Sequence, residues 1–199
     1  MKRLTAVILM SAMLLGLTAC GSSGGSAAAE TGSGTEDKPL LVENVDVGDF
    51  TVDVPAGWMG QLQQDIFADP DDNGDFPMKT DSYVLVKGGE NDWDSLTKPS
   101  IYIYLYENSL ADQAEMIVYW YDEAEEFSFT AENGDCIAYE ARTEDLVEEG
   151  FMNIYDLVFI DAGNGKVFQL NIPVDVADIG GVSLEDEDVL AIINSLKTK

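Results

Sequence analysis

Apolar and polar residues alternate in short stretches along much of the chain, and this alternation predicts β-strands. The first clear stretch is 50–54, which ends at Pro55-Ala56-Gly57 because proline cannot donate to a strand ladder and glycine allows a turn. Residues 60–81 lack the pattern and are expected to form a long loop with a short helix near 61–67. Further strands are expected at 82–87, 100–106, 127–131, 136–142, 153–160 and 166–172, with turns at Asn133-Gly134 and Gly163-Asn164-Gly165.

Two other stretches show the helical period, in which apolar residues recur every three or four positions. The first begins at Leu110, with Ser109 as its N-cap, and its stripe runs to Ala124, which predicts a helix of about four turns. The second is 184–196, whose acidic first turns and basic end suit the helix dipole. We expect Trp58 to share one core with three residues of the first stripe, Leu110, Ile117 and Tyr121.

The order of these elements is three strands, a helix, four strands and a helix. Consecutive hairpins favour antiparallel pairing, and helices packed on a sheet bury its apolar face. The sequence therefore predicts an α+β fold, in which an antiparallel sheet of about six to seven strands packs with two main helices.

The first residues have the features of an export signal. Lys2 and Arg3 precede the apolar stretch 4–15, which is too short for a membrane span because a span needs about 20 apolar residues. Leu17-Thr18-Ala19-Cys20 resembles the lipobox of bacterial lipoproteins. This resemblance implies that 1–19 are a lipoprotein signal peptide and that Cys20 carries a diacylglyceryl group, which would anchor the protein at the extracytoplasmic face of the cell membrane.

The lipidated cysteine and a flexible linker are expected to occupy 20–39, because Gly, Ser, Ala and Thr dominate this stretch and cannot form a core. The folded domain is expected at 40–199. The chain has 38 acidic and 10 basic residues, a net charge of −28. Such a charge disfavours nucleic acid, whose phosphates need Lys and Arg, and it disfavours docking on anionic lipids. The lipid would therefore provide the attachment to the membrane.

Histidine is absent, which excludes most nucleophilic triads and the common zinc and copper sites. Cys136 has no intramolecular partner if Cys20 is lipidated, and its strand pattern favours a buried, inert thiol. Ser95 and Lys98 match a Ser-x-x-Lys pattern, but Pro99 follows directly, and neither Ser-Asp-Asn nor Lys-Thr-Gly occurs. Carboxylates are so numerous that pairs at glycosidase spacing are expected by chance. We therefore expect no enzymatic activity.

Three segments together resemble the PsbP-like domains, small α+β domains found in many bacterial surface lipoproteins. They are Phe50–Trp58 (FTVDVPAGW), the mid-chain helix before a four-strand meander, and Val189–Lys197 (VLAIINSLK). The resemblance covers roughly residues 45–199 and implies an antiparallel sheet flanked by helices. It implies no functional residue. The family is named for an extrinsic photosystem protein, and metal binding in its photosystem members depends on histidines, of which this chain has none.

The strand expected at 100–106 presents tyrosines on one face and aliphatic residues on the other. Tyrosine rings in a row are typical of a platform for glycans or peptides. The alternative is that both sheet faces are covered, or that tyrosines simply suit a central strand. The candidate ligand platform consists of Tyr102, Tyr104 and Tyr106, with Trp93 as a further exposed aromatic.

An Asp-rich loop is the candidate metal site. Its residues Asp69, Asp71, Asn73 and Asp75, with Gly74, match the opening of an EF-hand calcium loop. The match then fails, because the twelfth position is Thr80 where a bidentate glutamate is required. The loop is therefore either a weaker calcium site or a solvated acidic turn. No cofactor other than this possible calcium is expected.

The favoured function is a membrane-anchored, extracytoplasmic lipoprotein that acts as a non-catalytic binding or interaction module. Its partner would be an extracytoplasmic protein or glycan, and no nucleic acid is expected. One alternative is a calcium-dependent structural or adhesion domain. A less favoured alternative is a cell-wall or glycan hydrolase, which a cleft with two carboxyls of perturbed pKa would support.

Overall fold

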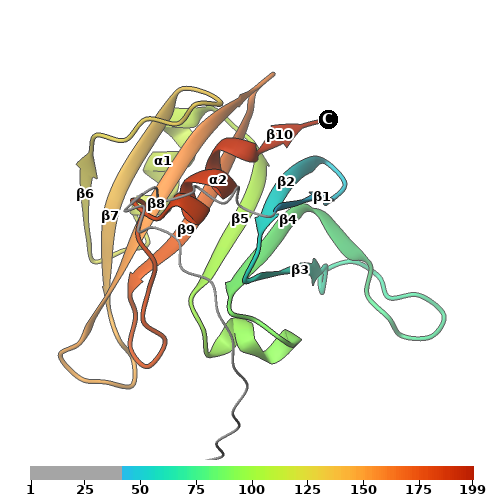
Figure 1. Ribbon diagram of the computed structural model, residues 1–199, viewed down its shortest axis with the longest axis horizontal. Helices are drawn as coiled ribbons and strands as arrows, with labels where there is room; N and C mark the ends of the chain where they lie inside the picture. Colours follow the sequence, from blue (N-terminus) through green and yellow to red (C-terminus); the bar gives the residue numbers. More distant parts are fainter. Residues whose placement is uncertain (1–41) are drawn as a thin grey trace, which may run out of the picture. The chain divides into compact units, whose positions relative to one another are not determined.

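The computed structural model describes residues 42–199. The expected signal peptide, Cys20 and the linker lie outside these residues. The described part belongs to the α+β class: it contains ten strands and two α-helices, arranged as a large sheet, a small sheet and a helix against each face of the large sheet (Figure 1). No helix in it is long and apolar enough to cross a membrane.

The large sheet has seven strands in the order β3-β4-β5-β9-β8-β7-β6, and every neighbouring pair is antiparallel. The β8–β9 hairpin turns at Asn164 and Gly165, as expected, with φ of 56° and 73°. The strands are β3 (Trp58–Gln64), β4 (Met78–Lys87), β5 (Ser100–Glu107), β6 (Glu123–Phe127), β7 (Cys136–Glu144), β8 (Met152–Gly163) and β9 (Lys166–Asp175).

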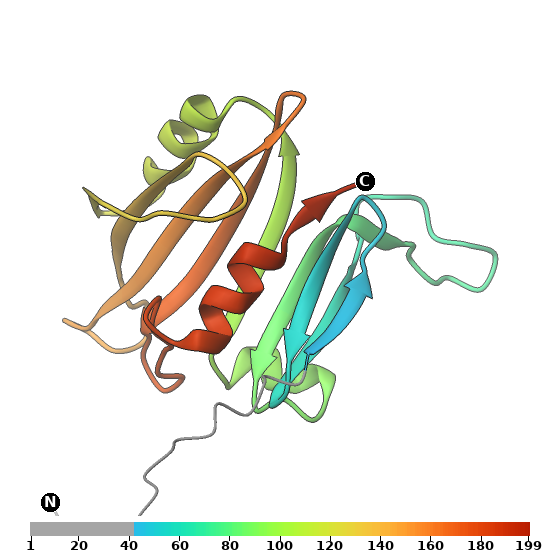
Figure 2. The ribbon, with the colours of Figure 1, turned by 45° about the horizontal axis from the view of Figure 1, so that its top comes forward.

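The small sheet was not expected from the sequence. It has the order β1-β2-β10, from β1 (Val42–Asp46), β2 (Phe50–Pro55) and β10 (Lys197–Thr198). With α2 (Glu187–Ser195) it lies over one face of the large sheet, the face towards the viewer in Figure 1 and seen from another angle in Figure 2. Phe50, Phe168 and Ile192, from β2, β9 and α2, are fully buried together in the main hydrophobic cluster.

The other helix, α1 (Leu110–Val118), lies on the opposite face, where it contacts β7, β8 and β9. A smaller buried cluster joins Ala114 of the helix to four residues of the sheet beneath it, Ala141, Leu157, Phe159 and Val167. The helix begins at Leu110 with Ser109 as its N-cap, as expected. It ends well before Ala124, because the residues from Glu123 onward pair with β7.

The prediction that Trp58 shares a core with the α1 stripe is wrong. Trp58 is buried, but it belongs to the main cluster on the α2 side, where its indole Nε1 donates to Asp188 Oδ2 at 2.7 Å. The α1 residues pack against the smaller cluster on the other face. Successive side chains of a strand point to opposite faces, so the sheet itself separates the two sets. The separated stripe residues are Leu110, Ile117 and Tyr121.

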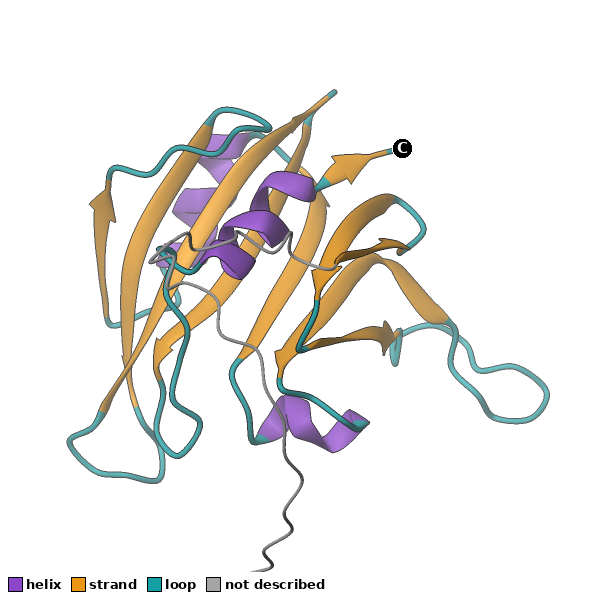
Figure 3. Ribbon diagram, viewed as in Figure 1, coloured by secondary structure: helices purple, strands orange, loops and turns teal. Residues whose placement is uncertain are grey.

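Two other expectations are also corrected. The stretch 61–67, expected as a short helix in a loop, contributes the second half of β3, and the loop proper is shorter (Figure 3). The strand expected at 127–131 instead covers Glu123–Phe127. Asn133 therefore lies in a longer connection, and its amide donates to the carbonyls of Ile193 and Leu196 at 2.9 and 3.2 Å. It satisfies carbonyls that the end of α2 leaves without helical partners.

Candidate binding face

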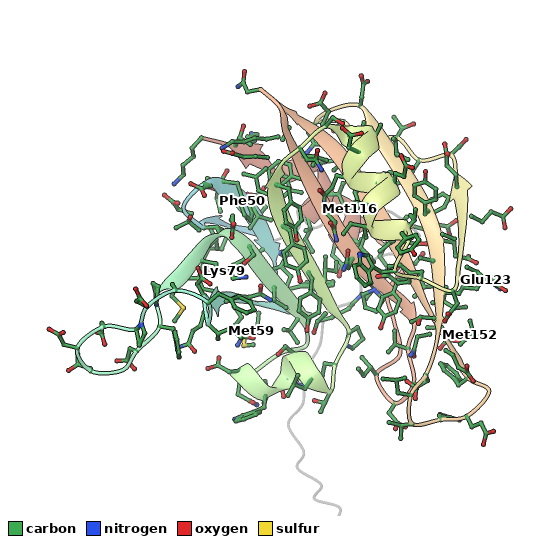
Figure 4. The ribbon with its side chains drawn as sticks, turned by 180° about the vertical axis from the view of Figure 1, so that it is seen from behind. Phe50, Met59, Lys79, Met116, Glu123 and Met152 are labelled. Atoms are coloured by element: carbon green, nitrogen blue, oxygen red, sulfur yellow. The ribbon has the colours of Figure 1, made fainter. Side chains whose placement is uncertain are left out.

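The α1 side of the large sheet is only half covered. Helix α1 contacts β7, β8 and β9, and no α-helix among residues 42–199 lies over the other half of that side, formed by β3, β4 and β5 (Figure 4). We call this uncovered half the open face. Met116 on α1 and Met59 on β3 mark its two sides in Figure 4. The other side of the same strands is closed by α2 and the small sheet.

The tyrosines of β5 lie on the open face. Ile101, Ile103 and Leu105 point into the main cluster, so the alternating Tyr102, Tyr104 and Tyr106 point the other way. The rings of Tyr104 and Tyr106 are stacked, with centroids 5.8 Å apart and an interplanar angle of 25°. Tyr102 and Tyr104 are half-buried and Tyr106 is exposed. Parts of the three rings are therefore accessible to a ligand.

The residues paired with these tyrosines are uncharged. Ser82 of β4 and Gln169 of β9 lie directly opposite Tyr104 on its two sides. Val84 and Asn171 occupy the same positions beside Tyr102. Ser82, Val84 and Gln169 are buried, so the accessible groups at the centre of the open face are the phenols and the partly exposed Asn171 amide.

Two further tyrosines extend the row beneath α1. Tyr121, just after α1, and Tyr155 of β8 meet edge to face with centroids 6.0 Å apart. Burial raises the pKa of Tyr104 to about 12, with Tyr106 and Tyr102 adding to the shift. Burial likewise raises the pKa of Tyr121 to about 12. These phenols stay neutral and keep their protons for donation. Sequence reasoning assigned Tyr121 to the core stripe and missed Tyr155, since only the sheet register brings them together.

Buried polar atoms are satisfied beneath α1 but not beneath the open face. Gln113 of α1 donates to Gln169 at 2.9 Å, and Gln169 in turn donates to Asn171 at 2.9 Å. By contrast, Ser82 Oγ and Gln61 Oε1 are buried and have no hydrogen-bond partner among residues 42–199. Ser82 is only 1% exposed. Buried polar groups without partners are uncommon in proteins, because each one loses its hydration without replacement.

A hollow of about 870 Å³ follows the β3 side of the open face. Gln61, Gln63 and Tyr102 line it, together with Ser95 of the short 3-10 helix η1 (Asp92–Leu96). The Tyr102 hydroxyl lies 3.5 Å from the Ser95 carbonyl, which places η1 at this end of the tyrosine row. Trp93, also on η1, is exposed.

The other candidate residues have structural partners. Lys98 Nζ donates to the Gly88 carbonyl and to Asp94 Oδ2 at 2.6 and 3.0 Å, whereas Ser95 Oγ donates to the Asp92 carbonyl. Neither contact couples the serine to a base. Cys136 is partly buried, and its thiol donates to the Phe129 carbonyl at 3.2 Å.

The Asp-rich loop joins β3 to β4, and Asp71 organises it from within. The Asp71 Oδ1 atom accepts the backbone N–H groups of Asn73 and Asp75 at 2.8 and 3.0 Å. These bonds, that from Asp75 first, lower the pKa of the Asp71 carboxyl. In the part of the chain that the structure describes, no group of three or more Cys, Asp or Glu side chains is placed to hold a metal ion. The calcium interpretation stays a prediction.

One carboxyl with a raised pKa lies on the α2 side. Burial raises the pKa of Asp156 to about 6, and Glu140, directly opposite on β7, adds to the shift. Glu140 is itself paired with Arg142, at 2.6 Å between Oε1 and Nη2. Asp156 and Glu140 lie side by side on neighbouring strands, and Arg142 binds Glu140, so the two carboxyls are not placed to flank a substrate as a glycosidase requires. The adjoining hollow, of about 410 Å³, is lined by Phe127, Phe129, Leu184 and these two acids.

The chain matches no protein-family model and no curated protein. The likeness to PsbP-like domains therefore rests on the sequence segments given above.

Proposed function

We propose that this protein is a membrane-anchored, extracytoplasmic lipoprotein whose domain is a non-catalytic binding module, and that the open face is its ligand-binding surface. The observation that carries this proposal is the row of accessible tyrosines on the half of the sheet that α1 leaves uncovered. The PsbP-like assignment, on the sequence segments above, belongs to the same proposal.

The chemistry of the open face favours an uncharged glycan. Tyrosine rings offer flat apolar surfaces for the C–H faces of sugar rings, and their hydroxyls are protonated at neutral pH and can donate hydrogen bonds. A strongly anionic ligand would be repelled by the charge of −28, and a strongly basic one would find no carboxylate among the residues paired with the tyrosines.

The ligand test uses the full chain in detergent, titrated calorimetrically with neutral bacterial surface polysaccharides. Tyr104→Ala is expected to weaken binding at least about tenfold, because it removes the central ring of the row. Tyr119→Ala is the matched control, since this tyrosine is 84% exposed at the end of α1 and should leave affinity unchanged. Equal affinity of both variants, or no saturable binding by the unaltered chain, would contradict a glycan site on the open face.

The anchor is tested separately. Cys20→Ser is expected to abolish acyl labelling and to release the protein from the membrane fraction or leave it unprocessed, because the substituted side chain has no thiol to accept the lipid. Unchanged labelling and membrane retention in this variant would rule out lipidation at Cys20.

A further inference from the structure

The two edges of the large sheet differ in a way that points to a second binding site. Edge strands expose unpaired backbone groups, and proteins commonly protect them with charged residues or proline. The β6 edge follows this rule with Glu123, Glu125 and Glu126. The β3 edge, Trp-Met-Gly-Gln-Leu-Gln-Gln, has neither a charge nor a proline. Its regular stretch is Trp58–Leu62, which pairs one to one with β4 before a register shift.

The outer backbone groups of β3 are free of partners within residues 42–199. β3 is the terminal strand of the seven, and its backbone is hydrogen-bonded only to β4. β1, the strand of the small sheet that lines the hollow, pairs with β2 alone. The N–H and C=O groups on the outer side of Trp58–Leu62 can therefore bind a further strand.

Space for such a strand exists beside β3. The hollow of about 870 Å³ follows this edge and is lined on its far side by Val45 and Asp46 of β1. At its outer end lie Ile66 and Phe67, of which Phe67 is 90% exposed. Apolar side chains exposed around a hollow commonly mark a site of protein contact.

The occupant has to be an extended polypeptide, because only another strand satisfies alternating donors and acceptors along an edge. Its charge is set by the surroundings. The loop that follows β3 carries five acids, Asp65, Asp69, Asp71, Asp72 and Asp75, and the whole chain carries −28. A second copy would bring two such loops and two such charges together, whereas a basic segment is attracted.

We propose that the β3 edge binds an extended, basic segment of a partner protein by strand addition. The side chains on one face of the added strand meet Val45 and Leu62, and those on the other face meet Gln61 and Gln63. The segment therefore alternates apolar and polar residues, with Lys or Arg at its ends beside the acidic loop. This proposal does not rest on glycan binding by the open face, since it uses the backbone of the edge.

The test uses the full chain in detergent and a capped peptide of alternating valine and threonine with paired lysines at both ends. The peptide is expected to bind and to slow amide hydrogen exchange in Trp58–Leu62. Two matched peptides separate the contributions. Replacing the lysines by glutamates should weaken binding at least about tenfold. N-methylation of the alternate backbone amides that would face β3 should abolish binding, because it removes the donors of the added ladder.

A protein variant completes the experiment. Leu62→Glu copies the protection of the β6 edge and should weaken peptide binding at least about tenfold without shifting the urea midpoint, because Leu62 is already exposed. Met116→Glu, at an exposed apolar residue of α1, should leave peptide binding unchanged. Protection mapped outside β3, or equal binding of the N-methylated peptide, would overturn strand addition. Sedimentation of the unaltered chain as a dimer that Leu62→Glu dissociates would show that a second copy occupies this edge.

Discussion

The two sides of the large sheet are covered to different extents. The α2 side is closed by a helix and a second sheet, and 22 buried hydrophobic residues form its cluster. The α1 side has a single helix of nine residues, and its cluster has only five buried hydrophobic residues, one of which is on the helix. Most of the apolar burial that stabilises the domain therefore belongs to the α2 side.

The difference leaves part of the α1 side free for recognition. A tyrosine tolerates half-burial, because its ring packs while its hydroxyl remains hydrated. The row on β5 can therefore be stable without a cover and stay available to a ligand. The contrast predicts that substitutions on the α2 side act mainly on stability and that those on the open face act mainly on binding.

The largest expected effect is at Trp58, on the closed side. Trp58→Ala should lower the free energy of unfolding by about 3–5 kcal/mol, because the ring is 8% exposed and its Nε1 binds Asp188. Trp120→Ala is the control, since this tryptophan is 76% exposed and should change stability by less than about 0.5 kcal/mol. Urea unfolding measures both values. A loss below about 1 kcal/mol for Trp58→Ala would mean that Trp58 is not buried and that the α2 side is not closed around it.

A smaller effect on the free energy of unfolding is expected to differ between the two halves of the α1 side. Gln113→Leu should cost about 1–3 kcal/mol, because it leaves the buried Gln169 amide without its partner beneath α1. Ser82→Ala, beneath the open face, removes a hydroxyl that has no partner and should be neutral or slightly stabilising. Urea unfolding measures both free energies. If the two substitutions destabilise the domain equally, buried polar groups are not better hydrogen-bonded beneath α1 than beneath the open face.

The smallest effect depends on pH. The folded state raises the pKa of Asp156 from 3.8 to about 6, so between these pH values the folded protein binds more protons than the unfolded chain. The contribution of Asp156 to stability is therefore greatest below pH 3.8, falls through this window and is lowest above pH 6. Asp156→Asn should stabilise the domain at neutral pH by roughly 1 kcal/mol or less after solvent screening, and not at all below the window.

The measurement is the urea midpoint of Asp156→Asn and of the unaltered chain across this range. Asp161→Asn serves as the control on the same strand, because Asp161 is exposed. If the two urea midpoints are equal at neutral pH, the Asp156 carboxylate is well solvated in the folded state.

Local patterns predicted those elements whose residues repeat with a clear period. The alternation at 100–106 correctly indicated β5 and the side on which its tyrosines lie, and the stripe at 184–196 indicated α2. Elements without a strong period were missed. β1 is Val-Glu-Asn-Val-Asp and becomes a strand by pairing with β2, and β3 contains three glutamines and becomes one by pairing with β4.

The helical period also misled where two structures competed. Tyr121 and Ala124 continue the α1 stripe, yet the chain leaves the helix after Val118 so that Glu123 and Ala124 can pair with Arg142 and Ala141 of β7. The pairing of Glu140 with Asp156, which contributes to the perturbed pKa, is also set by register between strands. No local pattern contains that information, because the partners lie far apart in the chain.

The sequence by itself determined the strands with strong alternation, the two helices, the net charge, and the direction in which the β5 tyrosines point. These properties depend on backbone geometry within a few residues and on composition. Only the tertiary structure decided that α1 covers β7, β8 and β9 and not β5, that Trp58 packs beneath α2, and that the uncharged β3 lies at an edge. The reason is that cover and edges arise from contacts between distant segments, whose energies no local period encodes.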